Sequence, residues 1–224
     1  MPLDLPIICV VTRARGIVGS QEQLALLRRL SSAIEAGASM IQVRERHMDD
    51  RSLLDFVRTL VALTSGTSCS VLVNDRADIV LAAGAHGVHL KSDSLSVADA
   101  RRILPTAAIV GRSVHGSDEA SAIASAGGCD YLIFGTVYPS SSKAEDHPVA
   151  GLDALRQVCR SVPLPVVAIG GISIPRAGEA RLAGAAGIAA ISLFTEAPDP
   201  GRVVHALRNA LTVKEGDVKL APHD

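Results

Sequence analysis

The chain has 224 residues, of which 48% are hydrophobic, enough to bury the core of one large domain. Its formal net charge is -1, from 22 basic and 23 acidic residues, and aromatic residues make up 2%, so we expect no nucleic-acid or anionic-membrane partner. The sequence has no apolar run of membrane-spanning length and no signal-like N-terminal segment, so we expect a cytoplasmic protein.

Short apolar segments alternate with longer amphipathic ones along the chain. The short ones predict eight strands, over residues 7–12, 40–44, 71–74, 87–90, 108–113, 131–137, 166–169 and 189–194. Between them, apolar residues at spacings of three and four predict helices that include 21–36, 51–63, 96–104, 118–126 and 152–162. Four glycines that lie shortly before strands are expected to end helices: Gly37, Gly84, Gly127 and Gly184.

Eight strands with intervening helices, spread over about 210 residues, predict a single (β/α)8 TIM barrel, an α/β fold. A doubly wound sheet is disfavoured, because it has fewer strands and a Gly-x-Gly-x-x-Gly turn after the first, which this sequence lacks. We expect the barrel to occupy residues 1–211 and residues 212–224 to form a flexible C-terminal tail.

The cysteines, Cys9, Cys69, Cys129 and Cys159, are far apart and include no Cys-x-x-Cys pair. This spacing predicts neither a zinc site nor a disulfide framework, so we expect reduced core thiols.

A diglycine turn follows the predicted strand 166–169, in the segment PVVAIGGIS. Without Cβ atoms, Gly170 and Gly171 let backbone N–H groups approach an anion closely. Ser173 and Pro175 then form a typical helix start. The pattern predicts a phosphate-binding turn, and the alternative is a turn in which glycine only avoids steric conflict.

In such a barrel, chemistry gathers at the carboxyl ends of the strands. Arg44 and Arg46 alternate along a predicted strand, so we expect both side chains on the interior face. Two guanidinium groups there, beside Lys143, favour a bound anion. The alternative is two internal ion pairs, Arg44 with Asp75 and Arg46 with Asp93. With the diglycine turn on the opposite wall, the site is expected to hold two anionic groups.

The sequence also carries a family resemblance. QVRER at 42–46, ND at 74–75, GVHL at 87–90, GRSVH at 111–115, FGTVYPSSSK at 134–143 and AIGGI at 168–172 follow in an order that resembles the thiamine phosphate synthase and TenI-like family, from residue 8 to about residue 211. A synthase of this family expels pyrophosphate from a pyrimidine diphosphate, and the nitrogen of a thiazole phosphate attacks the remaining pyrimidine cation. The resemblance implies these phosphorylated substrates and Mg2+ as cofactor, and it leaves a homodimer open.

The resemblance also implies roles for individual residues. It assigns the diphosphate to Arg44, Arg46, Asn74, Ser140, Ser142 and Lys143, the pyrimidine to Gln42 and Ser113, and the thiazole phosphate to Gly170, Gly171 and Ser192, with Thr136 also binding substrate. The expected catalytic residues are Arg44, Lys143, Ser113 and His115, where His115 acts either as general acid or base or as a hydrogen-bonding support. Mg2+ is expected on Asp75 and Asp93.

Three positions depart from the family pattern. Arg46 replaces a lysine, Ser94 replaces the second of two acidic residues after the fourth strand, and Thr136 stands where TenI-like proteins have a catalytic histidine. Three functions are therefore considered: a thiamine phosphate synthase, a TenI-like thiazole phosphate tautomerase that uses His115 or His89, and a non-catalytic phospholigand-binding regulator.

Overall fold

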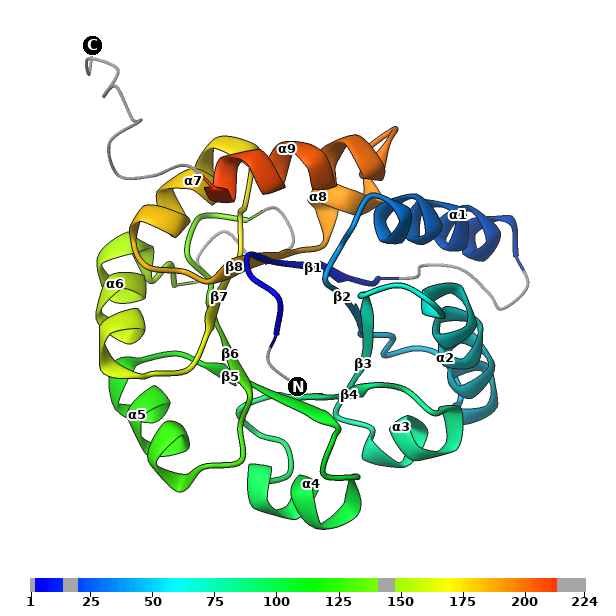
Figure 1. Cartoon of the computed structure of the whole chain (residues 1–224), viewed down its shortest axis with the longest axis horizontal. Helices are drawn as coiled ribbons and strands as arrows, with labels where there is room; N and C mark the ends of the chain where they lie inside the picture. Colours follow the sequence, from blue (N-terminus) through cyan, green and yellow to red (C-terminus); the bar gives the residue numbers. More distant parts are fainter. Residues whose placement is uncertain (1–2, 14–19, 141–147, 213–224) are drawn as a thin grey trace.

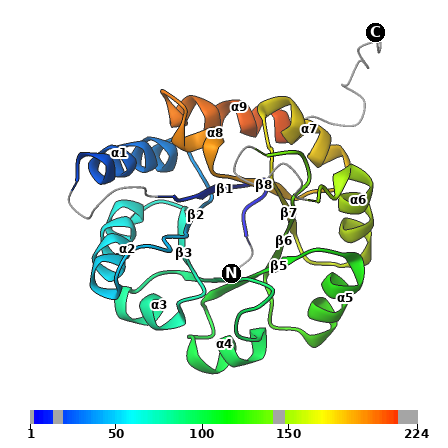
Figure 2. The same cartoon turned by 180° about the vertical axis from the view of Figure 1, so that it is seen from behind.

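The computed structural model describes residues 3–13, 20–140 and 148–212. Within these ranges, parallel strands close into a barrel in chain order, and helices surround it (Figure 1). The strands are β1 (Ile7–Val11), β2 (Met40–Val43), β3 (Ser70–Asn74), β4 (Gly87–Leu90), β5 (Ile109–Val114), β6 (Tyr131–Gly135), β7 (Val166–Ile169) and β8 (Gly187–Ala190). The view from behind shows the same closed ring (Figure 2), so the predicted (β/α)8 barrel is confirmed.

Several helices begin at a residue whose side chain caps the helix N-terminus. Ser20, Asp49, Ser96 and Ser173 each accept a hydrogen bond from a backbone N–H group in the first helical turn. The predicted helix start at Ser173 is therefore confirmed. The helices are α1 (Gln21–Glu35), α2 (Asp50–Thr64), α3 (Ala77–Ala83), α4 (Val97–Ile103), α5 (Ser117–Ala126), α6 (Gly151–Ser161), α7 (Ile174–Leu182), α8 (Ser192–Thr195) and α9 (Pro200–Thr212).

The glycines expected to end helices all have positive φ angles, 91° at Gly37, 69° at Gly84, 75° at Gly127 and 103° at Gly184. They follow α1, α3, α5 and α7, so each one ends the helix before an even-numbered strand. The last helix, α9, includes Thr212, one residue beyond the predicted end of the barrel, and the rest of the predicted tail lies outside the described residues.

The eighth strand was expected over residues 189–194, and that position is wrong. β8 covers Gly187–Ala190, and the apolar residues after it form the short helix α8. Ile191, Leu193 and Phe194 continue the apolar run past the end of β8, and Phe194 is buried in α8. An apolar run does not by itself distinguish a buried strand from a buried helical turn.

Two apolar layers hold the barrel together. Side chains including Cys9, Met40 and Tyr131 fill its interior, and a larger set packs between the strands and the helices. All four cysteines are free, as expected. Burial raises the pKa of the Cys9 and Cys69 thiols to about 12, so they remain protonated at neutral pH.

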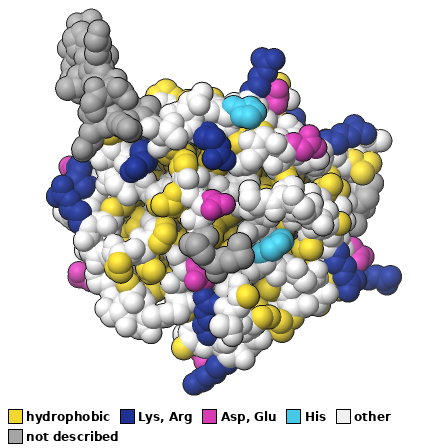
Figure 3. Space-filling view, viewed as in Figure 1, with side chains coloured by type: hydrophobic (Ala, Val, Ile, Leu, Met, Phe, Trp, Pro, Cys, Tyr) yellow, Lys and Arg dark blue, Asp and Glu magenta, His cyan; other side chains and the backbone are white. Residues whose placement is uncertain are grey.

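The surface agrees with the neutral composition. On the face shown in Figure 3, Lys and Arg side chains lie mostly around the outline, with acidic side chains among them, and no broad patch of one sign covers the centre. Among the described residues, no helix is long and apolar enough to cross a membrane.

Candidate active site

The predicted site residues that the structure describes lie at or just beyond the carboxyl ends of the strands. Ser142 and Lys143 lie outside the described residues. The others are Gln42 in β2, Arg44 and Arg46 after it, Asn74 and Asp75 at the end of β3, Asp93 after β4, Ser113 and His115 at the end of β5, Thr136 and Ser140 after β6, Gly170 and Gly171 after β7, and Ser192 after β8.

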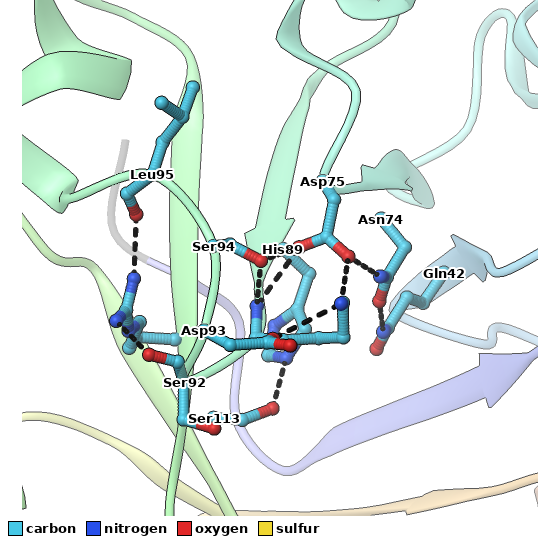
Figure 4. A network of polar contacts seen from close by, with 11 residues as sticks. Gln42, Asn74, Asp75, His89, Ser92, Asp93, Ser94, Leu95 and Ser113 are labelled. Atoms are coloured by element: carbon cyan, nitrogen blue, oxygen red, sulfur yellow. Dashed lines mark hydrogen bonds and ion pairs between the residues drawn. The ribbon is translucent and has the colours of Figure 1, made fainter.

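A chain of hydrogen bonds crosses the ends of β2 and β3. The Gln42 amide donates through Nε2 to Oδ1 of Asn74 at 2.8 Å, and Asn74 donates through Nδ2 to Oδ2 of Asp75 at 2.6 Å (Figure 4). Gln42 is 4% exposed, and its buried Oε1 has no hydrogen-bond partner in the structure. An unsatisfied buried acceptor costs about 1–3 kcal/mol, so Oε1 marks a position where a ligand donor would be stabilising.

The Asp75 carboxylate is bound on both oxygens by the chain itself. Oδ1 accepts hydrogen bonds from the Lys91 backbone N–H group at 3.0 Å and from the Ser94 hydroxyl. The Lys91 Nζ atom lies 3.3 Å from Oδ2 of Asp75 and 3.1 Å from Oδ1 of Asp93. Asp75 has a φ angle of 62°, in the left-handed region, which turns the chain sharply after β3.

These residues do not fit a protein-held Mg2+ ion well. Mg2+ prefers carboxylate, phosphate and water oxygens in an octahedral shell. Here an ammonium group lies between the two expected carboxylates, and the hydroxyl of Ser94 donates to Asp75. Within the part of the chain that the structure describes, no three Asp, Glu, His or Cys side chains converge on one point. The Mg2+ requirement therefore stays a prediction.

Arg44 is a half-buried cation. Burial lowers its pKa, and the positive charges of Arg46 and Arg13 lower it further. The charges of Asp75 and Glu45 oppose this lowering, but Asp75 and Asp93 form their ion pairs with Lys91 and not with these guanidinium groups. Guanidinium groups that crowd together without a paired carboxylate favour an anionic ligand.

The predicted geometry of the arginines needs two corrections. The alternative of two ion pairs, Arg44 with Asp75 and Arg46 with Asp93, is not realised, because both carboxylates pair with Lys91. Arg46 is exposed and does not lie in the barrel interior. The strand ends at Val43, so the alternation of faces no longer applies three residues later.

His89 lies inside the barrel and is 1% exposed. Its Nδ1 atom lies 3.0 Å from the Tyr131 hydroxyl, and its Nε2 atom lies 2.9 Å from Oγ of Ser113. Burial lowers the pKa of His89 to about 4, a direction that the nearby Arg112 charge reinforces and that of Asp75 opposes. The imidazole is therefore neutral at pH 7, and it holds the Ser113 hydroxyl in place.

His115 is exposed at the end of β5. Its Nδ1 atom is 3.2 Å from the carbonyl oxygen of Gly135, so Nδ1 is the donor in this contact. Its backbone N–H group donates to Glu119 at 2.8 Å. These contacts orient the ring toward the end of β6, next to Thr136, and they agree with the support role considered for His115.

The diglycine turn shows the steric requirement for glycine and leaves anion binding as a prediction. Gly170 and Gly171 have φ angles of 101° and 61°. A Cβ on Gly170 would lie 2.5 Å from Cγ2 of Thr136, and one on Gly171 would lie 2.3 Å from the Pro139 carbonyl oxygen, so steric conflict excludes side chains. The N–H groups of both glycines also have no partner among the described residues, which leaves them available to an anion.

Ser192 lies beside this turn. β7 and β8 are neighbours, with Ile169 opposite Ala189, so the residues that follow the two strands reach the same side of the barrel mouth. The Ser192 N–H group has no acceptor within the described ranges. The barrel mouth thus has guanidinium groups at the ends of β1 and β2 and unpaired backbone donors at the ends of β7 and β8.

Lys91 received no role from the sequence. The pattern of β4 could have suggested a role. Gly87, His89 and Lys91 occupy every second position, and His89 of this set lies in the barrel interior. Arg112 was also missed. It donates to the carbonyl oxygens of Leu95 at 2.7 Å and Ser92 at 2.8 Å, and so holds the loop after β4. Nothing in the sequence alone gives these two acceptors.

Comparison with known proteins gives consistent matches. The sequence model of the thiamine monophosphate synthase family matches residues 9–194. The thiamine-phosphate synthase of Anaeromyxobacter dehalogenans is 44% identical over 184 residues, which cover 82% of this chain and 81% of that protein. That of Chlorobium luteolum is 36% identical over 214 residues, covering 94% and 97%. The solved structure of thiamine phosphate pyrophosphorylase from Pyrococcus furiosus superposes with a TM-score of 0.79 at 34% identity, covering 92% of this chain and 95% of that chain.

A closed parallel barrel with cationic side chains and free backbone N–H groups at its carboxyl end is a (β/α)8 protein of the phosphate-binding class. This chain belongs to the thiamine monophosphate synthase family, and the resemblance found in its motifs is confirmed.

Proposed function

We propose that the protein is a thiamine-phosphate synthase, which joins hydroxymethylpyrimidine diphosphate to thiazole phosphate and releases pyrophosphate. The relatives that cover most of the chain carry this name. The observation that carries the proposal is the pair of different anion-binding sets at one barrel mouth. Guanidinium groups without carboxylate partners lie at the ends of β1 and β2, and the free N–H groups lie at the ends of β7 and β8.

The reaction needs stabilisation of a leaving group more than a strong base. The C–O bond between the pyrimidine methylene and the diphosphate breaks, and its electron pair leaves with pyrophosphate. The lone pair of the thiazole nitrogen then forms the new C–N bond. Negative charge grows on the leaving oxygen, and a half-buried guanidinium group such as Arg44 stabilises it strongly because little water screens it.

The pyrimidine would be oriented from the interior. Gln42 offers the buried acceptor Oε1, which suits the amino group of the ring. Ser113 offers a hydroxyl that neutral His89 holds at 2.9 Å. With the diphosphate toward Arg44 and the thiazole phosphate on the diglycine turn, both substrates would lie over the same barrel mouth, which brings the reacting atoms together.

The tautomerase alternative is less well supported by the histidines. His89 is buried, its two ring nitrogens contact Tyr131 and Ser113, and its pKa of about 4 makes it a weak base. His115 directs Nδ1 to a backbone carbonyl group. Thr136 stands where TenI-like proteins have the catalytic histidine. His89 and Thr136 are therefore poorly suited to abstract a proton.

Purified protein supplied with both phosphorylated precursors should release pyrophosphate and thiamine phosphate in equal amounts. The assay is run with Mg2+ and with a chelator, beside an active synthase as control. Arg44→Gln should reduce the rate, and Arg156→Ala, which removes an exposed ion pair on α6, should not. Tight binding of both precursors without turnover would favour the regulator, and isomerisation of thiazole phosphate alone would favour the tautomerase.

A further inference from the structure

The loop after β4 places a lysine ammonium group where the family resemblance led us to expect a metal ion. Lys91 Nζ lies 3.3 Å from Asp75 and 3.1 Å from Asp93, the two residues expected to hold Mg2+. The Lys91 side chain is 38% exposed, compared with 24% for Asp75 and 77% for Asp93. The ammonium group therefore lies at the edge of the barrel mouth.

The surrounding contacts fix this arrangement. The Ser94 N–H group donates to the Lys91 carbonyl oxygen at 3.1 Å, which closes a tight turn, and the Lys91 N–H group is 3.1 Å from Oγ of Ser94. Arg112 holds the same loop through the carbonyl oxygens of Ser92 and Leu95 (Figure 4). The turn thus positions both the ammonium group and the Ser94 hydroxyl on the Asp75 carboxylate.

The carboxylate has little capacity left for a metal ion. Asp75 accepts from Asn74, from the Lys91 and Ser94 groups, and carries the ion pair as well. A divalent ion beside it would also lie within a few ångströms of a positive charge, which opposes its binding. The second acidic ligand of the family pattern is Ser94 here, and its hydroxyl brings no negative charge.

We propose that the Lys91 ammonium group is a built-in cation that replaces a protein-held divalent ion at the Asp75–Asp93 pair. An ammonium group has three donors. Two face carboxylates, and the third has no partner among the described residues, so it is available to an oxygen of the diphosphate. The identity of the anion in this assignment rests on the proposed function. The effect of Lys91 on metal binding does not depend on that function.

The first test measures metal affinity directly on the substrate-free protein. Mn2+, which takes oxygen ligands as Mg2+ does, is titrated and its free fraction followed by electron paramagnetic resonance. Lys91→Ala should bind Mn2+ at least about tenfold more tightly than the unaltered protein, because a unit charge about 4 Å from a divalent ion opposes it by at least that factor. Lys91→Arg keeps the charge and should stay weak, and Arg156→Ala should match the unaltered protein. Equal Mn2+ affinity for the unaltered protein and Lys91→Ala would overturn the proposal.

The second test uses the coupling reaction. The unaltered protein should keep most of its rate when a chelator replaces Mg2+, whereas Lys91→Ala should lose its rate in the chelator and regain it with Mg2+. Complete loss of activity of the unaltered protein in the chelator would also overturn the proposal. If the unaltered protein couples nothing under any condition, the proposed function fails, and the Mn2+ titration still decides the role of Lys91. Circular dichroism of each variant shows whether the barrel is intact.

Discussion

Replacing the buried imidazole of His89 should change how the stability of the barrel depends on pH. His89 is 1% exposed, and burial lowers its pKa from 6.5 to about 4. In the unfolded chain the same imidazole titrates near 6.5. Below that pH the unfolded chain takes up a proton that the folded protein does not, so the free energy of unfolding falls as the pH falls.

The size of this loss follows from the two pKa values. Above pH 6.5 the imidazole is neutral in both states and costs nothing. Between pH 6.5 and about 4, each pH unit removes about 1.4 kcal/mol from the free energy of unfolding. From pH 7 to pH 5 the contribution of His89 is therefore a loss of about 2 kcal/mol.

Urea unfolding followed by circular dichroism at pH 7 and pH 5 measures this loss. His89→Gln keeps a donor and an acceptor for Tyr131 and Ser113 but does not titrate, so its loss over the same range should be about 2 kcal/mol smaller than that of the unaltered protein. His205→Gln, on the exposed side of α9, is the matched control and should leave the loss unchanged. An equal loss in the unaltered protein and in His89→Gln would refute a buried, neutral His89.

Three further substitutions separate the roles proposed at the barrel mouth. Gly170→Val places a Cβ 2.5 Å from Thr136 at a φ angle of 101°, so the KM for thiazole phosphate should rise while the affinity for the diphosphate is kept, as steady-state kinetics with each substrate varied would show. Lys143→Ala should do the reverse, and calorimetric titrations in which both variants weaken both ligands equally would contradict the division into two anion sites. Arg44→Gln should lower kcat by about 10- to 100-fold, the value of a charged hydrogen bond, and an unchanged kcat in single-turnover kinetics would remove Arg44 from the leaving-group site.

The repetition of strands and helices could be predicted from the sequence because it depends on residues that are close together in the chain. The glycines that end helices and the serine cap at Ser173 each act within a few residues, and the structure contains them as expected. β8 was misplaced because the apolar run from Ile188 continues past the end of the strand through Ile191 and Leu193 to buried Phe194. The local pattern carries no signal for where the strand stops.

The site was predicted in outline, and its pairings were not. That Asp75 and Lys91 meet depends on the register of β3 against β4, in which Asn74 lies opposite His89. From the sequence, Asp75 and Asp93 were expected to hold Mg2+, with pairing to Arg44 and Arg46 as the alternative, and Lys91 had no role. Arg46 was assigned to the interior because the alternation of faces was extended past Val43, where the strand stops. Long-range register and strand length, rather than residue type, decided both outcomes.

The two proposed anion sites differ in kind, and the chemistry of the proposed reaction gives a reason. The diphosphate gains charge as it leaves, so its site needs full positive charges close to the breaking bond, and half-buried Arg44 with the ammonium group of Lys91 can supply them. The thiazole phosphate keeps its charge throughout the proposed reaction, so anchoring is enough, and the partial charges of the free N–H groups at Gly170 and Gly171 would provide it. Losing an interaction that strengthens only in the transition state lowers kcat. Losing an interaction that is equally strong in the ground state and the transition state raises KM. The substitutions at Arg44 and Gly170 should therefore differ in which constant they change.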